Sequence, residues 1–110
     1  MPTSKKIITK QYGIIGHPLV HSYLPTFFNE KFAQKGLKSE YKAFDIASIQ
    51  AFPTIVQEHP LMRGFNVTIP YKKAVLPYCN ALSSQARRLG SVNTIVKKAD
   101  GTLWGHNTDY

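Results

Sequence analysis

The apolar positions of this chain fall into short groups whose spacing alternates between that of strands and that of helices. Residues 12–15, 40–46 and 64–68 are apolar or alternate between apolar and polar, which predicts three strands, the first extending back to Ile7 and Ile8. Apolar residues recur at helical spacing between Pro25, which suits a first helical turn, and Gly36, which is a stop signal. A second, shorter helix is expected from a cap at Ser48 through Val56, with Pro53 interrupting or restarting it.

The second half of the chain continues with shorter elements. Helical turns are expected around 72–78 and around 84–89, the latter ended by Gly90. Strands are expected over 92–97 and 102–105, joined by a turn at Asp100 and Gly101 that is typical of a hairpin. The order strand, helix, strand, helix, strand, then hairpin predicts an α/β fold. We expect a three-layer α/β sandwich with a mostly parallel sheet and one antiparallel hairpin near the C-terminus.

The predicted sheet also indicates where a ligand would bind. In open parallel sheets, ligands collect beyond the carboxyl ends of the strands. Polar residues follow the first strand, in residues 16–22 (GHPLVHS), and the third strand, in residues 66–72 (NVTIPYK). We therefore expect these two segments to meet at one edge of the sheet.

Composition narrows the class of protein. A chain of 110 residues with 43% apolar residues fits one globular domain, and no apolar run reaches the ~20 residues that a membrane span needs. The first six residues, MPTSKK, lead into a strand-like segment without a signal-peptide core, so secretion is not expected. The single cysteine, Cys79, excludes an internal disulfide, suits a cytoplasmic protein and is expected to be a small buried apolar side chain.

The net charge of +8, with 14 Lys and Arg against 6 Asp and Glu, is compatible with a nucleic-acid binder or with a site for small anions. The basic residues are spread along the chain and form no basic helix face, so we expect most of them on a solvated surface and no nucleic acid as partner. A basic nucleic-acid module stays open as an alternative. His17, His21 and His59 have no metal-ligand spacing with a cysteine or carboxylate, so no metal site is expected.

Lys72 is the most informative titratable residue. A lone lysine is usually solvated, and Lys73 is expected to be so, but Pro70 fixes a turn after a buried strand and directs Lys72 toward the strand tip. Partial burial there can bring the pKa of a lysine toward neutrality, which proton transfer requires.

Three further polar residues have a plain and a functional interpretation. Ser22 precedes a helix, where it can cap the helix or, together with free amides, hold a carboxylate. Asn93 begins a strand, where asparagine is unfavourable, so its amide either satisfies a neighbouring loop or binds a ligand. Asp109 lies in an Asn-Thr-Asp sequence that would, in isolation, be a turn or helix cap.

Taken together and in this order, the four segments 16–22, 66–72, 91–94 (SVNT) and 105–109 (GHNTD) resemble the substrate-binding half of the shikimate dehydrogenase family, from about Tyr12 to Tyr110. The resemblance implies reduction of 3-dehydroshikimate to shikimate with NADPH, a step toward chorismate and the aromatic amino acids. It implies that Lys72 and Asp109 are catalytic and share the proton of the reacting oxygen. It also implies that Ser22 binds the substrate carboxylate, and that Thr68 and Asn93 bind ring hydroxyls.

One position departs from the family pattern. The loop usually reads Ser-x-Ser, and here the second serine is Leu24, which cannot donate a hydrogen bond. Binding of the carboxylate is then weaker, rearranged, or supplied in part by Tyr23 or Thr26. Two alternatives therefore stay open: a quinate/shikimate dehydrogenase paralogue with a remodelled acid pocket, and a non-catalytic domain that binds a small acid.

The resemblance also predicts the domain organisation. Residues 1–105 would be the substrate-binding domain, and residues 106–110 would begin the connection to a dinucleotide-binding domain. No Gly-x-Gly-x-x-Gly follows a strand in this chain, so no cofactor-binding residue is expected here, and NADP would be bound by a domain absent from it. We expect this part alone to be inactive, with shikimate or 3-dehydroshikimate as ligand and no membrane as partner, and a homodimer stays open.

Overall fold

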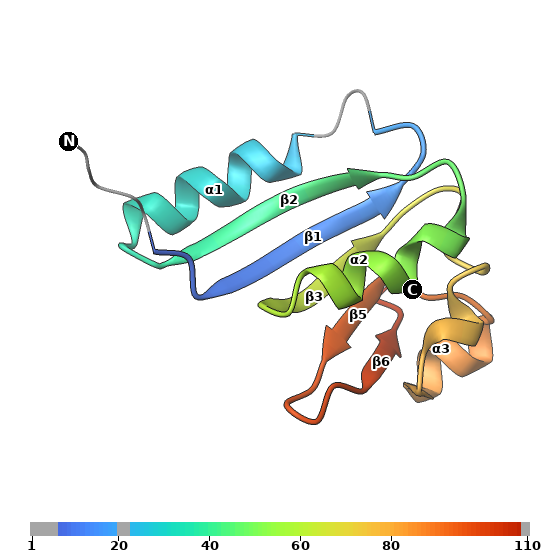
Figure 1. Cartoon of the computed structure of the whole chain (residues 1–110). Coiled ribbons are helices and arrows are strands. Elements are labelled where there is room, and N and C mark those ends of the chain that lie inside the picture. The colour runs from blue at the N-terminus through green and yellow to red at the C-terminus, as the bar shows by residue number, and fades with distance from the viewer. Residues whose placement is uncertain (1–6, 20–22, 109–110) are drawn as a thin grey trace.

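A computed structural model of the chain describes residues 7–19 and 23–108. It contains a six-stranded sheet in the order β2-β1-β3-β5-β6-β4. The strands are β1 (Lys10–Gly16), β2 (Ser39–Asp45), β3 (Met62–Val67), β4 (Ala81–Leu82), β5 (Thr94–Lys97) and β6 (Leu103–His106). The helices are α1 (Leu24–Gln34), α2 (Phe52–Glu58) and α3 (Ser84–Leu89), with 3-10 turns at η1 (Ile49–Ala51) and η2 (Leu76–Tyr78). Figure 1 shows α1 beside β2 and β1, and α3 near the C-terminal strands.

The predicted fold class is confirmed. β1 pairs in parallel with β2 and β3, and β4 with β6, whereas β5 runs antiparallel to both β3 and β6. β5 and β6 form the expected hairpin, whose turn includes Gly101 at φ +89°. Helices cover both faces of the sheet, which gives three layers.

The main core lies between the sheet and the helices α2 and α3. Its fully buried members include Ile15 of β1, Phe52 of α2, Ala86 of α3 and Ile95 of β5. Successive strand residues point to opposite faces, so Tyr12 of β1 faces the other side. There α1 packs through its aromatic residues, as in the pairs Tyr12–Phe32 and Phe28–Tyr41, whose ring centroids lie 5.9 and 5.0 Å apart.

The local signals for the helices act as expected at three positions. The Ser48 hydroxyl oxygen accepts a hydrogen bond from the Gln50 amide over 3.2 Å and caps η1, after which α2 restarts with Pro53 in its first turn. Gly90 ends α3 in the left-handed conformation at φ +66°. Gly36, at the same φ, follows the end of α1.

The structure corrects several boundaries. Ile7 and Ile8 do not belong to the first strand, which begins at Lys10, and Ile7 is 68% exposed. The strand predicted from Val92 begins at Thr94, and the segment 72–78 forms turns and one 3-10 helix. β4 was not predicted, because its two residues are a strand only through pairing with β6, Ala81 opposite Trp104 and Leu82 opposite Gly105.

Candidate functional site

The polar residues singled out from the sequence meet where several strands end. β1, β2 and β3 run in parallel and terminate at one edge of the sheet. β5 is antiparallel to β3 and begins at that edge, with Asn66 opposite Thr94, and β6 ends there, with Thr94 opposite His106. We call this the carboxyl edge, defined by Gly16, Asp45, Val67, Thr94 and His106 at the strand ends. It is the edge at which the sequence predicts a ligand.

Thr68 follows β3 directly and is half-buried. Its amide donates to the Ile15 carbonyl over 3.0 Å, and its carbonyl accepts from the Tyr71 amide over 2.9 Å, which closes a turn through the cis Ile69–Pro70 bond. The Thr68 methyl group packs against Gly16, where a Cβ atom would lie only 2.5 Å from it. The hydroxyl-bearing side chain is thus held against the tip of β1.

Lys72 follows in the same segment, and the structure confirms the difference between it and its neighbour: Lys72 is half-buried and Lys73 is exposed. Its carbonyl oxygen accepts a hydrogen bond of 2.7 Å from the amide of Val92, which is fully buried. Val92 directly precedes Asn93, so the lysine segment and the Asn93 segment are bonded to each other. The predicted catalytic and ring-binding residues Lys72, Thr68 and Asn93 therefore share the carboxyl edge.

Asn93 uses its side chain within the protein. Its Nδ2 donates to Thr108 Oγ1 over 2.9 Å, and its Oδ1 accepts from the Thr108 amide over 3.1 Å and from Thr94 Oγ1 over 3.0 Å. The loop-satisfying interpretation of this amide is thus realised. An asparagine amide has two N–H donors. Only one N–H of Asn93 donates to a residue that the structure describes, because the other two bonds are accepted by Oδ1.

A second asparagine, Asn107, connects the same two segments, a role that the sequence did not indicate. Asn107 is 7% exposed, and its Nδ2 donates to the Ser91 carbonyl and to Ser91 Oγ over 3.0 and 2.8 Å. Together with the Asn93–Thr108 bonds, it joins the chain after β6 to the chain before β5. Asp109, two residues after Asn107, lies outside the described residues.

The chain after β1 carries the predicted carboxylate site. Ser22 lies outside the described residues, so its role as a ligand stays a prediction. Leu24 is the first residue of α1 and is half-buried, and Tyr23, the N-cap, is 70% exposed and makes no side-chain cap hydrogen bond. The Tyr23 and Thr26 side chains, which could replace the missing serine, are both exposed.

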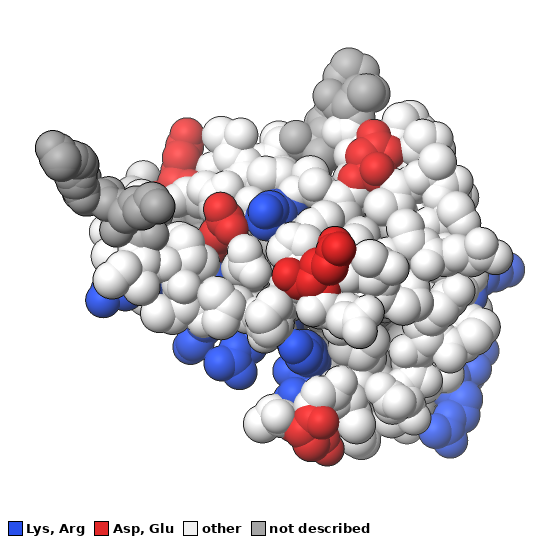
Figure 2. Space-filling model, in the orientation of Figure 1, with Lys and Arg blue, Asp and Glu red and all other residues white. Residues whose placement is uncertain are grey.

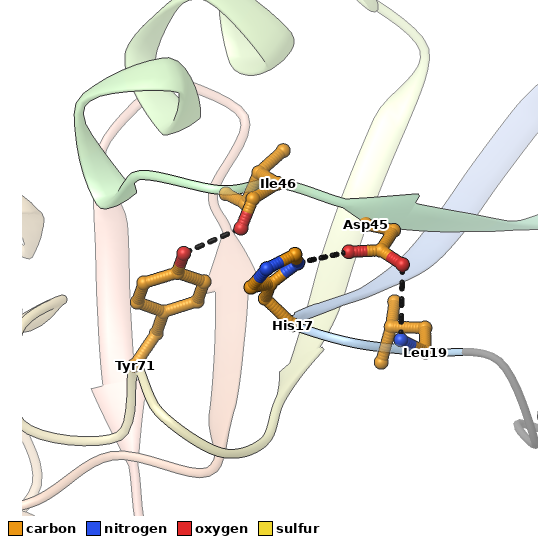
Figure 3. A network of polar contacts seen from close by, with 5 residues as sticks. All are labelled: His17, Leu19, Asp45, Ile46 and Tyr71. Carbon is orange, nitrogen blue, oxygen red and sulfur yellow. Dashed lines mark hydrogen bonds and ion pairs between the residues drawn. The ribbon is translucent and has the colours of Figure 1, made fainter.

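Asp45, at the end of β2, is a further polar residue of the carboxyl edge to which the sequence assigned no role. Figure 3 shows its carboxylate between His17 and Leu19: Oδ1 lies 2.6 Å from His17 Nδ1, and Oδ2 accepts from the Leu19 amide over 3.0 Å. The His17 hydrogen bond, followed by that of the Leu19 amide, holds the pKa of the Asp45 carboxyl below its ordinary value. The carboxylate is therefore charged at neutral pH.

A well-formed pocket lies elsewhere among the described residues. It has a volume of about 520 Å³ and lies on the α1 face of the sheet, between Phe28, Phe32, Tyr41 and Val96. None of Thr68, Lys72 and Asn93 lines it. Its walls are mainly aromatic and aliphatic, which does not suit a polyhydroxylated acid, so the chemistry places the candidate site at the carboxyl edge.

The remaining expectations concern cysteine, charge and other ligands. Cys79 is half-buried against the core, and burial raises the pKa of its thiol, as expected of an apolar packing residue. Acidic side chains are spread over the face shown in Figure 2, with basic side chains mostly along its lower and right margins. Over residues 7–19 and 23–108 there is no cluster of metal-ligating side chains and no helix long and apolar enough to cross a membrane.

A nicotinamide cofactor does not fit the described part of the chain. The turn between β1 and α1 contains Gly16, His17 and Pro18 rather than a run of glycines, and Asp45 rather than a phosphate-binding amide approaches it. We therefore assign no step at this site to a bound dinucleotide.

Comparison with known proteins identifies the family of this chain. Residues 14–95 match the family model of the shikimate dehydrogenase substrate binding domain. The chain is 43% identical over 101 residues to the shikimate dehydrogenase (NADP(+)) of Geobacillus kaustophilus. The aligned region covers 91% of this chain and 36% of that relative. It thus spans about a third of the length of such relatives.

Two solved structures are informative. Shikimate 5-dehydrogenase from Listeria monocytogenes, in complex with shikimate and NAD, matches with a TM-score of 0.82 and 38% identity over 97% of this chain and 38% of that one. The ligand-free 5-ketofructose reductase of a Gluconobacter strain matches with a TM-score of 0.81 and 25% identity over 91% of this chain and 36% of that one. The family match and the fold show that this chain belongs to the shikimate dehydrogenase family and corresponds to the N-terminal substrate-binding domain.

Proposed function

We propose that this chain is the substrate-binding domain of an enzyme that reduces 3-dehydroshikimate to shikimate with NADPH, a step toward chorismate and the aromatic amino acids. The observation that carries the proposal is the convergence of Thr68, Lys72 and Asn93 at the carboxyl edge, because a hydroxyl, an ammonium and an amide there match a polyhydroxylated ketone. The shikimate bound to the Listeria relative supports the choice of substrate class.

The role of Lys72 follows from what its ammonium can do. Reduction of a ketone leaves negative charge on the carbonyl oxygen, and an ammonium at that oxygen stabilises the charge and supplies the proton. In the reverse direction the amine accepts the proton of the hydroxyl. A carboxylate at Asp109 would keep Lys72 charged and orient it over the same oxygen.

The remaining residues bind and orient the ring. Thr68, held against Gly16, presents a hydroxyl, and the second N–H of Asn93 is a donor to a ring hydroxyl. Ser22, with free amides at the start of α1, would hold the carboxylate, assisted by Tyr23 or Thr26 where Leu24 replaces a serine. These contacts orient the ketone toward Lys72.

The cofactor requires another part of the protein. Relatives carry NADP(+) in their names, and the Listeria structure contains NAD. Because no Gly-x-Gly-x-x-Gly follows a strand in this chain, the dinucleotide would be bound outside it. We propose that residues 1–105 form the substrate-binding domain and that 106–110 begin the connection to the domain that holds NADP. Alone, the present chain would bind the substrate weakly and not turn it over. A cytoplasmic location fits the single Cys79.

The test is steady-state turnover of the full-length protein with shikimate and NADP, measured for the wild type, Lys72→Ala and Lys73→Ala. We expect Lys72→Ala to lose about 10²- to 10⁴-fold in kcat, the range of a proton-transfer group. Lys73→Ala is the matched control, because it removes an equal charge from an exposed neighbour and should leave kcat unchanged. Equal turnover by all three proteins would contradict the catalytic role of Lys72.

A second candidate is suggested by Leu24. A leucine at the predicted carboxylate site is compatible with a related cyclic hydroxy acid such as quinate as substrate, and the match to a 5-ketofructose reductase shows that this fold also occurs in a reductase of another ketone. Comparison of kcat/KM for shikimate and quinate decides between the two. Absence of turnover with either acid, together with binding of one of them, would indicate a non-catalytic small-acid binding domain.

A further inference from the structure

The end of β2 supplies no residue to the predicted site, yet it is bonded to both loops that do. Asp45 and Ile46 lie between the loop after β1 and the loop after β3, as Figure 3 shows. These contacts join residues 25 to 28 positions apart in the sequence. The segment 45–46 therefore connects the two loops from one side.

The contact to the first loop is made by the Asp45 side chain. Its two carboxylate oxygens accept hydrogen bonds from the His17 ring and from the Leu19 amide, over 2.6 and 3.0 Å. Two acceptors on one rigid carboxylate determine both the position and the direction of residues 17–19. The His17 and Asp45 side chains are 48% and 41% exposed, so the hydrogen bond between them is open to solvent. The hydrogen bond from the Leu19 amide acts on the backbone itself.

The contact to the second loop is made by the Ile46 backbone. The Tyr71 hydroxyl donates to the Ile46 carbonyl, and the Tyr71 ring is 6% exposed. Tyr71 directly precedes Lys72, and its amide and carbonyl take part in the turns on either side, with Thr68 and Val75. A buried side chain bonded at its tip leaves the backbone at Lys72 little freedom to shift.

A backbone bond closes the arrangement between the loops. The His17 amide donates to the Ile69 carbonyl over 3.0 Å, so the loop after β1 and the loop after β3 also touch directly. The Ile46 amide in turn donates to the Gly16 carbonyl over 3.1 Å. The tips of β1, β2 and β3 thus form one bonded unit.

From this geometry we propose that Asp45 and Tyr71 are positioning residues that act through two different loops, Asp45 on substrate binding and Tyr71 on catalysis. The inference rests on the proposed function. The loop after β1 packs at Gly16 against Thr68 and is bonded at the His17 amide to the Ile69 carbonyl. The proposed contact of Thr68 to a ring hydroxyl is present in the ground state and the transition state alike, so displacement of this loop raises KM. Tyr71 acts through Lys72, whose proton is transferred only during the reaction, so its displacement lowers kcat.

The experiment compares Asp45→Asn and Tyr71→Phe in the full-length protein, with shikimate and NADP as substrates. Asp45→Asn keeps the size of the side chain but leaves only one acceptor oxygen, and Tyr71→Phe keeps the buried ring but removes the hydroxyl. We expect KM for shikimate to rise about tenfold in Asp45→Asn with kcat within about twofold. We expect kcat to fall about tenfold in Tyr71→Phe with KM within about twofold.

The matched control is Tyr41→Phe. It removes another tyrosine hydroxyl hydrogen bond, from Tyr41 to Asn66 Oδ1 over 2.6 Å, in the same sheet and on a residue that is 4% exposed. It should lower the melting temperature and leave KM and kcat unchanged. A purely structural role predicts the same result for Asp45→Asn and Tyr71→Phe, a lower melting temperature with wild-type KM and kcat, and would overturn the inference.

Failure of the proposed function has a different signature. In that case the wild type does not turn over shikimate, or Lys72→Ala retains full turnover. If the wild type is active and Lys72→Ala is not, the split between KM and kcat tests the positioning roles alone. A concerted fall of kcat in both variants with unchanged KM would also contradict the separation of roles between the two loops.

Discussion

The amide of Val92 donates a hydrogen bond of 2.7 Å to the carbonyl oxygen of Lys72. Val92 is fully buried and directly precedes Asn93, whereas Lys72 lies in the turns that follow β3. One backbone bond therefore joins the segment of the proposed proton donor to the segment of the proposed ring-binding amide. Their relative position is set by the sheet and does not depend on a ligand, which is the preorganisation that catalysis requires.

The carboxylate site can be tested by restoring the serine that the family usually carries. In the full-length protein, Leu24→Ser should strengthen shikimate binding by at most ~1.5–3 kcal/mol, the value of one hydrogen bond to a charged group. Leu24→Ala is the control, because it removes the leucine without adding a hydroxyl. The dissociation constant for shikimate measures both. An unchanged constant in Leu24→Ser would mean that Tyr23, Thr26 or another group already fills the role.

Asn93 is expected to serve both stability and substrate binding. Asn93→Ala removes three hydrogen bonds, to Thr108 and Thr94, and should cost about 1–2 kcal/mol in the free energy of unfolding. If its remaining N–H binds a ring hydroxyl, kcat/KM for shikimate should also fall about tenfold, or ~1.4 kcal/mol.

Asn80→Ala is the matched control for Asn93. The Asn80 side chain accepts from the Leu103 amide over 2.7 Å, at the opposite end of β6 from the carboxyl edge. It should cost stability and leave kcat/KM unchanged. Equal kcat/KM in both variants would assign Asn93 to structure alone.

Gly16 should be required for the placement of Thr68. A Cβ atom at Gly16 would lie 2.5 Å from the Thr68 methyl carbon and 3.1 Å from the Ile69 carbonyl oxygen, so Gly16→Ala must displace them. We expect a loss of about 1–3 kcal/mol in the free energy of unfolding, as for overpacking, and a higher KM for shikimate. Both follow from denaturation and steady-state kinetics of the full-length protein.

Gly13→Ala provides the comparison for Gly16. Its Cβ atom would meet the Phe44 ring at 2.7 Å, on the same strand but away from the carboxyl edge. It should destabilise the protein without changing KM. A wild-type KM in Gly16→Ala would show that the position of Thr68 is not important for binding.

Stability should fall in acid through two exposed carboxylates. Hydrogen bonds from His17 and the Leu19 amide lower the pKa of Asp45, and hydrogen bonds from the Thr102 hydroxyl and amide lower that of Asp100, both from 3.8. A carboxyl group whose pKa is lower in the folded state than in the unfolded state contributes its full stabilisation of the folded state above the unfolded pKa. This contribution is lost as the pH falls through the folded pKa, here below 3.8.

The measurement is the urea midpoint at pH 6 and at about pH 3, on either side of the ordinary aspartate pKa. The urea midpoint should fall less between these two pH values in the double variant, which combines Asp45→Asn and Asp100→Asn, than in the wild type. An unchanged fall in the double variant would assign the acid sensitivity to other carboxylates.

Much of the fold could be predicted from local signals. The apolar groups around Ile14, Tyr41 and Phe65 became β1, β2 and β3, and Ser48, Gly36 and Gly90 act at helix ends as expected. These signals are local because capping and left-handed glycines depend on a few neighbouring residues. β4 and the exclusion of Ile7 from β1 depend on distant partners, so local periodicity could not predict them.

The residues of the site likewise include some that the sequence predicted and some that only the structure revealed. Thr68, Lys72 and Asn93 were singled out by residue type and position, and they lie at the predicted edge. Asp45 and Asn107 were missed, because their roles lie in bonds to His17, Leu19 and Ser91 that only the folded chain brings within reach. An aspartate at the end of a strand and an asparagine in a turn are too common to signal such bonds.

By itself, the sequence determined the order of strands and helices, the edge at which polar groups gather and the family to which the chain belongs. Periodicity, turn residues and motifs are properties of neighbouring positions, and they suffice for these conclusions. Only the tertiary structure decided which loops are bonded to one another, through Val92 and Lys72, Ile46 and Tyr71, and Asp45 and Leu19. Hydrogen bonds act over about 3 Å, and only folding brings residues 20 or more positions apart to that distance.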